Sequence, residues 1–455
     1  MRARENLEKS KVFQALPKFV LAPDEIETIE SPEGFREDLL RQIADAKSRI
    51  WISALYIEND ESGRQILAAL RKAKNDNPKL KIKVFVDFHR NQRPRVGEKD
   101  PAAIETFRDA NFEIIGVPVA ASEAGGVLHT KGMVFDNKLI YSGASCNDVY
   151  LHGKDKYRVD RYRKFNNKAL ADAFVQYLKK VFLESEAAED FTNGAVEIRK
   201  ENRAKIEALR LKLREANFSA GNTPAEIRKA ETYAVPIAGF GKGNPLNKTI
   251  VDLINAAEKN ITIYTPYFNI SKDVRTAIAA ALNKGIQVNI VVGDKEANDF
   301  YNSEKKIVEI RQKKLARREK RMMFAFDGLP YCYEHNLKKF MGDFRGEIDK
   351  NLLNIHLWQD GENTFHPKGV VIDDGEISLI TGHNMNRRGD KKDPENGIVI
   401  VSDDASVKAQ AVAEKDRFLE QTKPLTSPDG LPRITDYPLR QLVAMGIASL
   451  FKNRF

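Results

Sequence analysis

Apolar residues recur along this chain in a pattern of helices and strands that begins near residue 35. Over 35–46 they are spaced by three or four positions, as in an amphipathic helix, and the apolar run 50–56 that follows predicts a strand. A second helical pattern at 63–73 leads into another apolar run at 82–87. Helices that alternate with strands in this way predict an α/β sheet with helices on its faces.

The same order of elements returns in the second half of the chain. A helical pattern at 246–255 leads into the strand-like run 261–267, and a further helix at 274–283 leads into the run 288–294. Self-similarity over this length indicates an internal duplication. We therefore expect two similar α/β/α half-domains related by a pseudo-twofold axis.

One eight-residue motif occurs once in each half and follows the pattern His, any residue, Lys, four residues, Asp. The two copies are His129-Thr-Lys131-Gly-Met-Val-Phe-Asp136 and His366-Pro-Lys368-Gly-Val-Val-Ile-Asp373. Each copy is an apolar strand that runs into a glycine-containing turn. A pattern of this length, repeated with the same surroundings, indicates a shared function rather than two unrelated histidines.

A small polar turn follows each motif. The turns are Ser142-Gly-Ala-Ser145-Cys-Asn147 and Thr381-Gly-His-Asn384-Met-Asn386. The second turn lies further from its motif than the first, which leaves open whether Asn384 or Asn386 corresponds to Asn147.

The landmarks of the two copies divide the chain into four regions. We expect a first half-domain at 1–183, a charged helical connector without chemistry of its own at 184–230, a second half-domain at 231–436, and a C-terminal helix at 437–455. Tyr56 and Tyr267 end matching strands, but a longer stretch separates Tyr267 from its motif than separates Tyr56 from the first one. We infer an insertion in the second copy, for which the basic helical segment 304–321 is the candidate.

The C-terminal segment 437–455 combines apolar residues at helical spacing with arginine and lysine residues. A basic amphipathic helix of this kind can lie in a membrane interface. It can equally be a last helix that packs on the core of the protein.

The composition is that of a globular chain with a basic surface. Of 455 residues, 42% are hydrophobic and 31% are charged, and no apolar run approaches the roughly 20 residues needed to cross a bilayer. The N-terminus lacks an apolar signal core, and the two cysteines, Cys146 and Cys332, suit a reducing cytoplasm. The net charge of +9 is compatible with nucleic acid, an anionic membrane or a phosphate-bearing substrate.

Histidine and lysine without further metal ligands indicate phosphodiester chemistry. One imidazole can attack phosphorus, a second can protonate the leaving oxygen, and the lysines can stabilise the charge that develops on the phosphate oxygens. One motif supplies one histidine and one lysine, so both halves must meet around a single phosphate. The turn residues Ser145, Asn147, Asn384 and Asn386 are candidate neutral donors to the same oxygens.

The remaining motif residues, Asp136 and Asp373, are expected to orient or anchor partners within the site rather than to attack. A zinc or two-metal centre is disfavoured because lysine would repel the ion and the ligands are too few. We find no dinucleotide or P-loop glycine motif. The sequence thus predicts catalysis without a metal or a cofactor.

With these residues in view, the chain resembles the phospholipase D superfamily, and within it the bacterial CDP-diacylglycerol–serine O-phosphatidyltransferases. The stretches that carry the narrower resemblance are Ser53-Ala-Leu-Tyr56, Val86-Asp-Phe-His89-Arg90, Tyr141-Ser-Gly-Ala-Ser-Cys-Asn147, Thr265-Pro-Tyr267-Phe-Asn269 and Asn298-Asp299-Phe-Tyr301. The similarity runs from about residue 25 to the C-terminus.

The resemblance implies a two-step transfer of a phosphatidyl group from CDP-diacylglycerol to L-serine. By analogy His129 attacks the phosphorus, His366 protonates the departing CMP, and His366 then deprotonates the serine hydroxyl. Glu395 and its first-half counterpart Asp160 resemble the acidic partners of such a site. Tyr56 and Tyr267 are candidate substrate-binding residues.

Several alternatives remain open at the level of sequence. Within the superfamily these are a cardiolipin synthase and a phospholipase D-type hydrolase, which differ in the acceptor. A nuclease would explain the positive charge, but the apolar basic tail argues against nucleic acid as the partner. A catalytically silent lipid-binding scaffold is disfavoured by the intact motifs. For the transferase we expect a cytoplasmic protein, peripherally bound to the anionic inner membrane surface.

Overall fold

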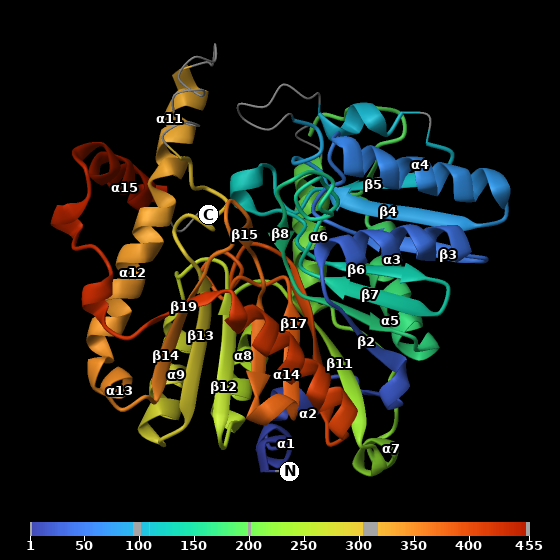
Figure 1. The fold of residues 1–455 in the computed structure, drawn as a ribbon. Helices are drawn as coiled ribbons and strands as arrows, with labels where there is room; N and C mark the ends of the chain where they lie inside the picture. The colour runs from blue at the N-terminus through green and yellow to red at the C-terminus, as the bar shows by residue number, and fades with distance from the viewer. Residues whose placement is uncertain (1, 94–101, 109, 199–201, 304–316, 452–455) are drawn as a thin grey trace.

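The computed structural model describes residues 2–93, 102–108, 110–198, 202–303 and 317–451, which form two halves side by side (Figure 1). The first half is built on an eight-stranded sheet whose order is β10 (Glu189–Asp190), β5 (Glu113–Val117), β4 (Lys81–Asp87), β3 (Arg49–Ser53), β6 (Gly132–Phe135), β7 (Lys138–Ser142), β9 (Tyr162–Phe165) and β2 (Ile26–Ile29). Its helices are α3 (Pro32–Asp45), α4 (Glu61–Asp76) and α5 (Lys168–Leu178).

The second half is built on a nine-stranded sheet. Its order is β1 (Phe19–Val20), β11 (Thr232–Gly239), β18 (Glu395–Ser402), β17 (Ile377–Thr381), β16 (Gly369–Ile372), β12 (Asn260–Thr265), β13 (Gln287–Gly293), β14 (Leu353–Trp358) and β19 (Thr422–Leu425). Helices α8 (Pro245–Ala256), α9 (Lys272–Asn283) and α14 (Ala405–Glu420) occupy places in the chain that correspond to α3, α4 and α5.

The two sheets match strand for strand. The order β5-β4-β3-β6-β7-β9-β2 in the first corresponds to β14-β13-β12-β16-β17-β18-β11 in the second, with parallel pairing in the first three strands and antiparallel pairing in the rest. This correspondence confirms the predicted α/β fold of two similar half-domains.

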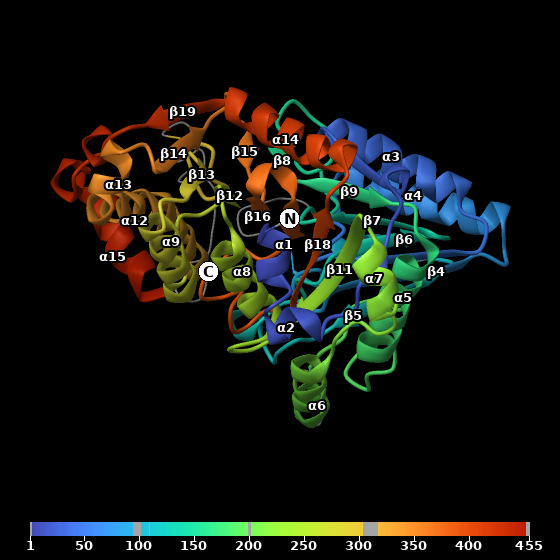
Figure 2. The same ribbon diagram turned by 90° about the horizontal axis from the view of Figure 1, so that it is seen from below.

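The N-terminal segment belongs to the second half and not to the first. Helices α1 (Arg2–Leu7) and α2 (Lys11–Gln14) pack on α8, and strand β1 pairs with β11. Leu7 and Phe13 are buried in the core of the second half, and the Arg4 guanidinium binds the Asp403 carboxylate at 2.8 Å. The predicted boundary at residue 1 is therefore wrong for this segment, because its apolar residues fill a site on the distant sheet (Figures 1 and 2).

The seam between the halves is closed by strand pairing and by buried charge. Strand β8 (Arg158–Val159) of the first half pairs in parallel with β15 (Thr364–Phe365) of the second. Next to this pair, the Glu414 carboxylate on α14 accepts hydrogen bonds from both Arg161 and Arg163. All three side chains are buried, and removal of one partner from such a network leaves an uncompensated charge, so the halves are held in a fixed relation.

Besides the N-terminal segment, the connector and a helical insertion lie outside the duplicated core. The connector contains α6 (Asn202–Glu215) and α7 (Pro224–Lys229), and α6 buries Ile206, Leu209 and Leu213. Between β13 and β14 the chain forms α11 (Arg317–Asp327), α12 (Leu329–Asp343) and α13 (Arg345–Asp349). Between β4 and β5 of the first half, the residues that the structure describes form a 3-10 turn (Ala103–Thr106). This location agrees with the predicted insertion, although residues 304–316 of the basic segment lie outside the described residues.

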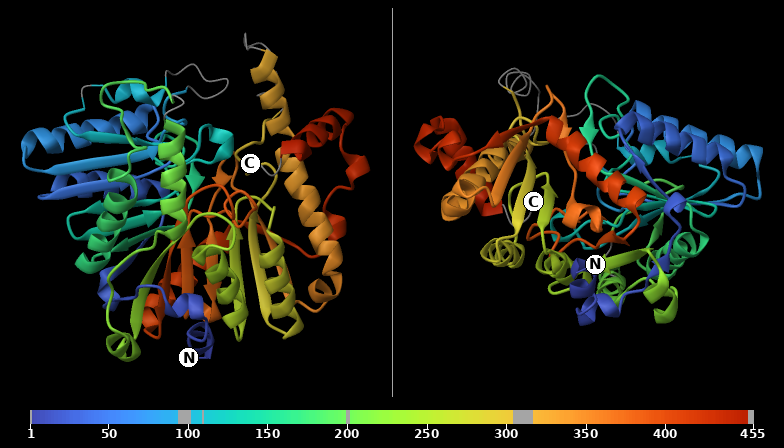
Figure 3. Two further views of the ribbon diagram at one scale, coloured as in Figure 1. Left: turned by 180° about the vertical axis from the view of Figure 1, so that it is seen from behind. Right: turned by 60° about the horizontal axis from the view of Figure 1, so that its bottom comes forward.

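The C-terminal helix α15 (Leu439–Phe451) packs against α11 and α12, which stand together along one side of the molecule (Figures 1 and 3). The Tyr437 hydroxyl donates to Glu334 at 2.7 Å, and Arg440 binds Asp327 at 2.5 Å. Of the two predicted roles for this helix, docking on the protein is thus observed for its inner face. Within the described part of the chain, no helix is long and apolar enough to cross a membrane.

Candidate active site

The two motif histidines lie at the seam, and each is bound by an acid from the opposite half. His129 precedes β6 of the first half, and its Nδ1 is 2.7 Å from Glu395 Oε2 at the start of β18 in the second half. His366 precedes β16 of the second half, and its Nδ1 is 3.3 Å from Asp160 Oδ2 near the start of β9 in the first half. The site therefore exists only when both halves are in place.

The residue after each acid extends this crossed arrangement. Asn396 binds the backbone of Lys131 twice, because its side-chain amide donates to the Lys131 carbonyl at 2.7 Å and its oxygen accepts from the Lys131 N–H at 2.8 Å. Arg161 occupies the matching position and donates to the Lys368 carbonyl at 3.4 Å. Each motif lysine is thus fixed by the half that does not contain it.

The two lysines differ in their partners. Lys131 Nζ donates to Ser145 Oγ at 2.8 Å, whereas Lys368 Nζ donates to Asp160 Oδ2 at 2.9 Å. Burial and the charge of Lys368 lower the pKa of Lys131 to about 7. Lys131 has a neutral hydroxyl as its partner, and both ammonium groups lie at one buried seam, so they are suited to bind the oxygens of a phosphate.

The charge states of His366 and of the two acids follow from their surroundings. Burial and then Lys368 lower the pKa of His366 to about 4, so this imidazole is neutral before a ligand binds. Burial raises the pKa of Glu395 and of Asp160, but for Glu395 the neighbouring His129, and for Asp160 the neighbouring Lys368 and His366, outweigh burial and hold each pKa below its ordinary value. Both acids are therefore ionised at neutral pH.

The two polar turns occupy equivalent places in the two halves, which shows that Asn386 and not Asn384 corresponds to Asn147. Asn147 Oδ1 accepts from the N–H of the third residue after it, and so does Asn386 Oδ1, which pairs Asn147 with Asn386 and Ser145 with Asn384. The two extra residues of the second copy lie in the β16–β17 hairpin loop. Since the oxygens of Asn147 and Asn386 bind backbone, only their NH₂ groups can serve a phosphate.

The turn of the second copy contains a buried oxygen atom to which no described residue donates a hydrogen bond. Asn384 Oδ1 is buried and has no hydrogen-bond partner among the described residues, whereas Ser145 in the first copy binds Lys131. Two glycines of these turns lie close to site residues, and at the first of them a Cβ would be too close to its neighbours. A Cβ at Gly143 would lie 2.8 Å from Lys368 Nζ, and one at Gly382 would lie 3.4 Å from His129 Nδ1.

Aromatic and charged residues surround His366, and the surroundings of His129 differ from these. The Tyr150 hydroxyl is 2.9 Å from His366 Nδ1, and the Tyr267 ring lies edge-on at 5.7 Å between centroids. Asp299 Oδ2 is 3.8 Å from His366 Nε2 and accepts a hydrogen bond from the Tyr267 hydroxyl. Tyr56, the first-half counterpart of Tyr267, lies beneath the Arg90 guanidinium at 5.8 Å.

The structure places Asp136 and Asp373 away from the histidines, so their predicted role within the site is wrong. Each follows the four-residue strand whose other end carries the lysine, a separation of roughly 20 Å from the histidine for an extended chain. The Asp136 carboxylate accepts from the backbone N–H groups of 47, 48 and 49, and that of Asp373 accepts from those of 258, 259 and 260. Both residues have positive φ, 51° and 48°, and they anchor the starts of β3 and β12.

This anchoring predicts a loss of stability. We expect Asp373→Ala to lower the free energy of unfolding by about 2–3 kcal/mol, because three backbone N–H groups lose a charged acceptor. Asp374→Ala is the matched control, since Asp374 is exposed and also has a positive φ of 56°. Urea denaturation of both variants tests the difference, and equal losses would contradict the anchoring role.

Several residues of the site were not identified from the sequence. Tyr150, Arg161, Asp299 and Asn396 each contact a motif residue, and Arg158 contacts Tyr150 and Asp299, yet none lies in a His-Lys-Asp motif. The signal available for Arg161 and Asn396 was their position directly after the two acids. Asp299 and Arg158 carried no such signal, because only the folding of the 294–301 loop onto β15 brings them to His366.

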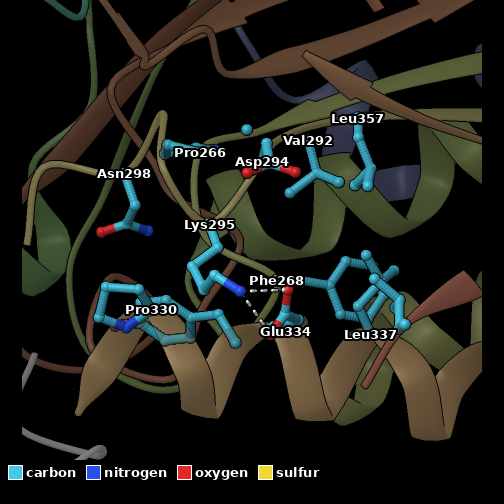
Figure 4. Close-up of a pocket in the computed structure, with 13 residues that line it drawn as sticks. Pro266, Phe268, Val292, Asp294, Lys295, Asn298, Pro330, Glu334, Leu337 and Leu357 are labelled. Carbon is cyan, nitrogen blue, oxygen red and sulfur yellow. Dashed lines mark hydrogen bonds and ion pairs between the residues drawn. The ribbon is translucent and has the colours of Figure 1, made fainter. Parts of the chain in front are cut away.

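A separate cavity lies next to the site, and Figure 4 shows residues that line it. It lies between the loop after β13 and helix α12, and is lined by apolar residues such as Phe268, Val292 and Leu337. Its main charged groups, Lys295 and Glu334, pair with each other at 3.2 Å. Tyr333 separates the cavity from the imidazole by stacking on Tyr267.

Among the described residues, no group of three or more His, Cys, Asp or Glu side chains is arranged to hold a metal ion.

Comparisons with known proteins agree with this geometry. Residues 39–148 and 250–417 match the family described as cardiolipin synthase, PLD-like domain. A Haemophilus influenzae protein named CDP-diacylglycerol–serine O-phosphatidyltransferase is 37% identical over 96% of this chain and 93% of its own. An Escherichia coli protein with the same name is 36% identical over 93% of this chain and 92% of its own. The crystal structure of a phosphatidylserine synthase from Haemophilus influenzae superimposes with a TM-score of 0.87 at 34% identity, and covers 100% of this chain and 98% of that one.

Proposed function

This chain belongs to the PLD-like domain family, and on that premise we propose that it transfers a phosphatidyl group from CDP-diacylglycerol to L-serine, giving phosphatidylserine and CMP. The observation that carries the proposal is the crossed pairing of His129 with Glu395 and of His366 with Asp160 at one seam. This pairing supplies two oriented imidazoles and two ammonium groups to one phosphorus. The relatives named for the same reaction support the choice of substrates.

The reaction proceeds in two displacements. In the first, the diphosphate binds beside His366, and this imidazole takes up a proton from solvent. His129 Nε2 then attacks the lipid-linked phosphorus, the bond from phosphorus to the CMP oxygen breaks, and His366 gives its Nε2 proton to CMP. In the second, His366 Nε2 takes the proton of the serine hydroxyl, the serine oxygen attacks phosphorus, and the phosphorus–nitrogen bond to His129 breaks. Lys131 and Lys368 bind the non-bridging oxygens in both steps, and Glu395 holds the His129 ring in the orientation for attack.

The direct test is incubation of the purified protein with labelled L-serine and CDP-diacylglycerol, with and without a chelator. We expect lipid-soluble label and stoichiometric CMP in both cases, because the residues of the proposed mechanism include no metal ligand. Label that disappears with the chelator would contradict catalysis without metal. Product from glycerol-based acceptors but none from serine would favour a cardiolipin synthase, and phosphatidic acid alone would favour a hydrolase.

The lowered pKa of Lys131 predicts a pH dependence. Below about pH 7 this ammonium is charged and stabilises the phosphate, and above that pH the free enzyme loses the proton. We therefore expect kcat/KM for CDP-diacylglycerol to fall by about tenfold for each pH unit above 7. The measurement is a pH profile at constant ionic strength, and Lys131→Arg should move the alkaline limb to higher pH. A wild-type profile that is flat to pH 9 would contradict this role.

We also propose that the enzyme acts at the cytoplasmic face of an anionic membrane, bound there through the outer face of its C-terminal region. Three of the four large apolar side chains that are most exposed among the described residues lie within ten residues of one another, namely Ile434, Leu439 and Val443. Leu439 is 77% exposed, while Ala444, Met445 and Ala448 on the inner face of α15 are buried. An amphipathic element with this division can dock on its own protein and bind a lipid interface at the same time.

Point substitutions separate these two tasks of α15. We expect the double variant Leu439→Asp/Val443→Asp to bind anionic vesicles about tenfold to 100-fold more weakly than the wild type, because two apolar side chains no longer enter the interface. Leu211→Asp is the control, since Leu211 is 58% exposed but lies on α6. Vesicle sedimentation at low and high salt is the measurement, and equal binding of all three proteins would refute the proposal.

A further inference from the structure

One carboxylate lies at the reactive edge of His366. The Nδ1 side of this ring faces Asp160 and Tyr150, so Nε2 is the nitrogen available for proton transfer. Asp299 Oδ2 lies 3.8 Å from that Nε2, outside the usual hydrogen-bond range, with a side chain that is only 12% exposed. An acid in this position cannot be explained as the partner that orients the ring.

The Arg158 guanidinium pairs with Asp299 Oδ1 at 2.9 Å, whereas Oδ2, the oxygen that faces His366, accepts a hydrogen bond from the neutral Tyr267 hydroxyl. A phosphate that approaches His366 brings negative charge to a carboxylate that is already buried, and like charges repel at short range. CDP-diacylglycerol carries no cation on its diphosphate. Of the two substrates of the proposed function, only L-serine carries a positive charge, on its α-ammonium group.

We propose that Asp299 and Arg158 form the site that binds the zwitterionic head of the amino-acid acceptor, with Asp299 on the ammonium and Arg158 on the carboxylate. This assignment rests on the proposed function and names the residues that recognise its acceptor. Serine carries its hydroxyl and its ammonium on adjacent carbons. It can therefore bridge the 3.8 Å gap, with the hydroxyl on His366 Nε2 and the ammonium on Asp299 Oδ2.

Arg158 is held where the second charge of the amino acid requires it. Its guanidinium lies 2.9 Å from Asp299 Oδ1, donates to Thr364 Oγ1 at 3.2 Å, and lies over the Tyr150 ring at 4.9 Å. A guanidinium has five N–H donors in a fixed plane, so it can bind a carboxylate while it remains paired with Asp299. The Asp299–Arg158 pair thus presents one negative and one positive group side by side, complementary to an amino acid.

The surroundings keep both groups charged and in place. Burial raises the pKa of Asp299, but the Arg158 guanidinium and the hydrogen bond from Tyr267 outweigh burial and hold this pKa below its ordinary value. The Tyr267 hydroxyl donates to Asp299 Oδ2 at 2.7 Å and fixes its rotamer. The cavity beside α12 is a poorer candidate for the acceptor, because its Lys295 and Glu334 pair with each other (Figure 4). Tyr333, which lines the cavity, stacks on Tyr267, and the Tyr267 ring in turn contacts His366.

The test compares the acceptor step with the step that precedes it. Acceptor transfer is followed with L-serine and with 3-hydroxypropionate, which retains the hydroxyl and carboxylate of serine but lacks the ammonium. The first step is followed as exchange of labelled CMP into CDP-diacylglycerol without an acceptor. For Asp299→Asn we expect kcat/KM for serine to fall by about 100-fold, mainly through KM, whereas CMP exchange changes by less than about threefold.

Two further variants make the comparison specific. Glu296→Gln removes an exposed carboxylate of the same loop and should leave all three rates unchanged. Asp299→Glu retains the charge and should recover part of the serine KM. In Asp299→Asn the preference for serine over 3-hydroxypropionate should shrink by the same factor as the loss in kcat/KM, because only the ammonium contact is removed.

The outcomes separate this assignment from the proposed function. If the wild type makes phosphatidylserine but Asp299→Asn retains its serine KM, the function stands and the acceptor site lies elsewhere. A serine KM that rises in Lys295→Gln and not in Asp299→Asn would place the acceptor in the cavity. Loss of CMP exchange in Asp299→Asn would assign Asp299 to the first step and overturn the proposal. A wild type that exchanges CMP but uses no acceptor with an ammonium group would refute both.

Discussion

His129→Ala is expected to abolish phosphatidyl transfer, with a fall in kcat of roughly 10⁴-fold or more, in a protein that folds normally. In the proposed mechanism His129 is the nucleophile, which is the one group that must form a bond to phosphorus. His129 is partly buried, and its imidazole pairs with the Glu395 carboxylate at the seam. Because the buried Glu395 carboxylate loses this partner, we expect a modest fall in melting temperature and a far larger fall in rate.

The measurement is transfer to labelled serine, together with trapping of the enzyme after acid-free quenching with labelled CDP-diacylglycerol. Wild type should retain label covalently and His129→Ala should not. His335→Ala, which removes a partly buried histidine of α12, is the matched control and should behave as wild type. Retention of label by His129→Ala but not by His366→Ala would reverse the roles of the two histidines.

Removal of one crossed contact is expected to give the second largest effect. Glu395→Gln leaves the shape of the side chain but removes the charge that holds the His129 ring, and we expect kcat to fall by about 10²-fold to 10⁴-fold. KM for CDP-diacylglycerol should change little, because Lys131 and Lys368 remain. Asp160→Asn should act on His366 in the same way, although this acid lies in the other half of the chain.

Asp393→Asn is the control for this prediction. Asp393 is buried, lies two residues before Glu395, and bridges the halves through Arg388 and the Val127 N–H, but it contacts neither histidine. Steady-state kinetics and thermal melts of the three variants are compared. If Glu395→Gln and Asp393→Asn lost activity equally, and in proportion to their loss of stability, the acids would serve only to hold the halves together.

The sequence by itself determined the repeated unit of this protein and most of its chemistry. The 3.6-residue and two-residue periods of apolar residues gave the order of helices and strands, because burial on one face of each element is a local requirement. The recurrence of His, Lys and Asp in the same spacing gave the duplication and both histidines. The same spacing explains why Asp136 and Asp373 do not lie in the site, because each lies seven positions after its histidine along an extended chain.

Only the tertiary structure decided that each histidine is bound by an acid from the opposite half. Glu395 and Asp160 are distant in sequence from the imidazoles that they bind, and they reach them because β18 and β9 lie at the seam between two sheets. The same holds for α1, α2 and β1, whose apolar residues could have filled either core, and for Asp299 and Arg158 at the edge of His366. Local periodicity specifies that a residue is buried, whereas the partner against which it is buried depends on how the two halves pack.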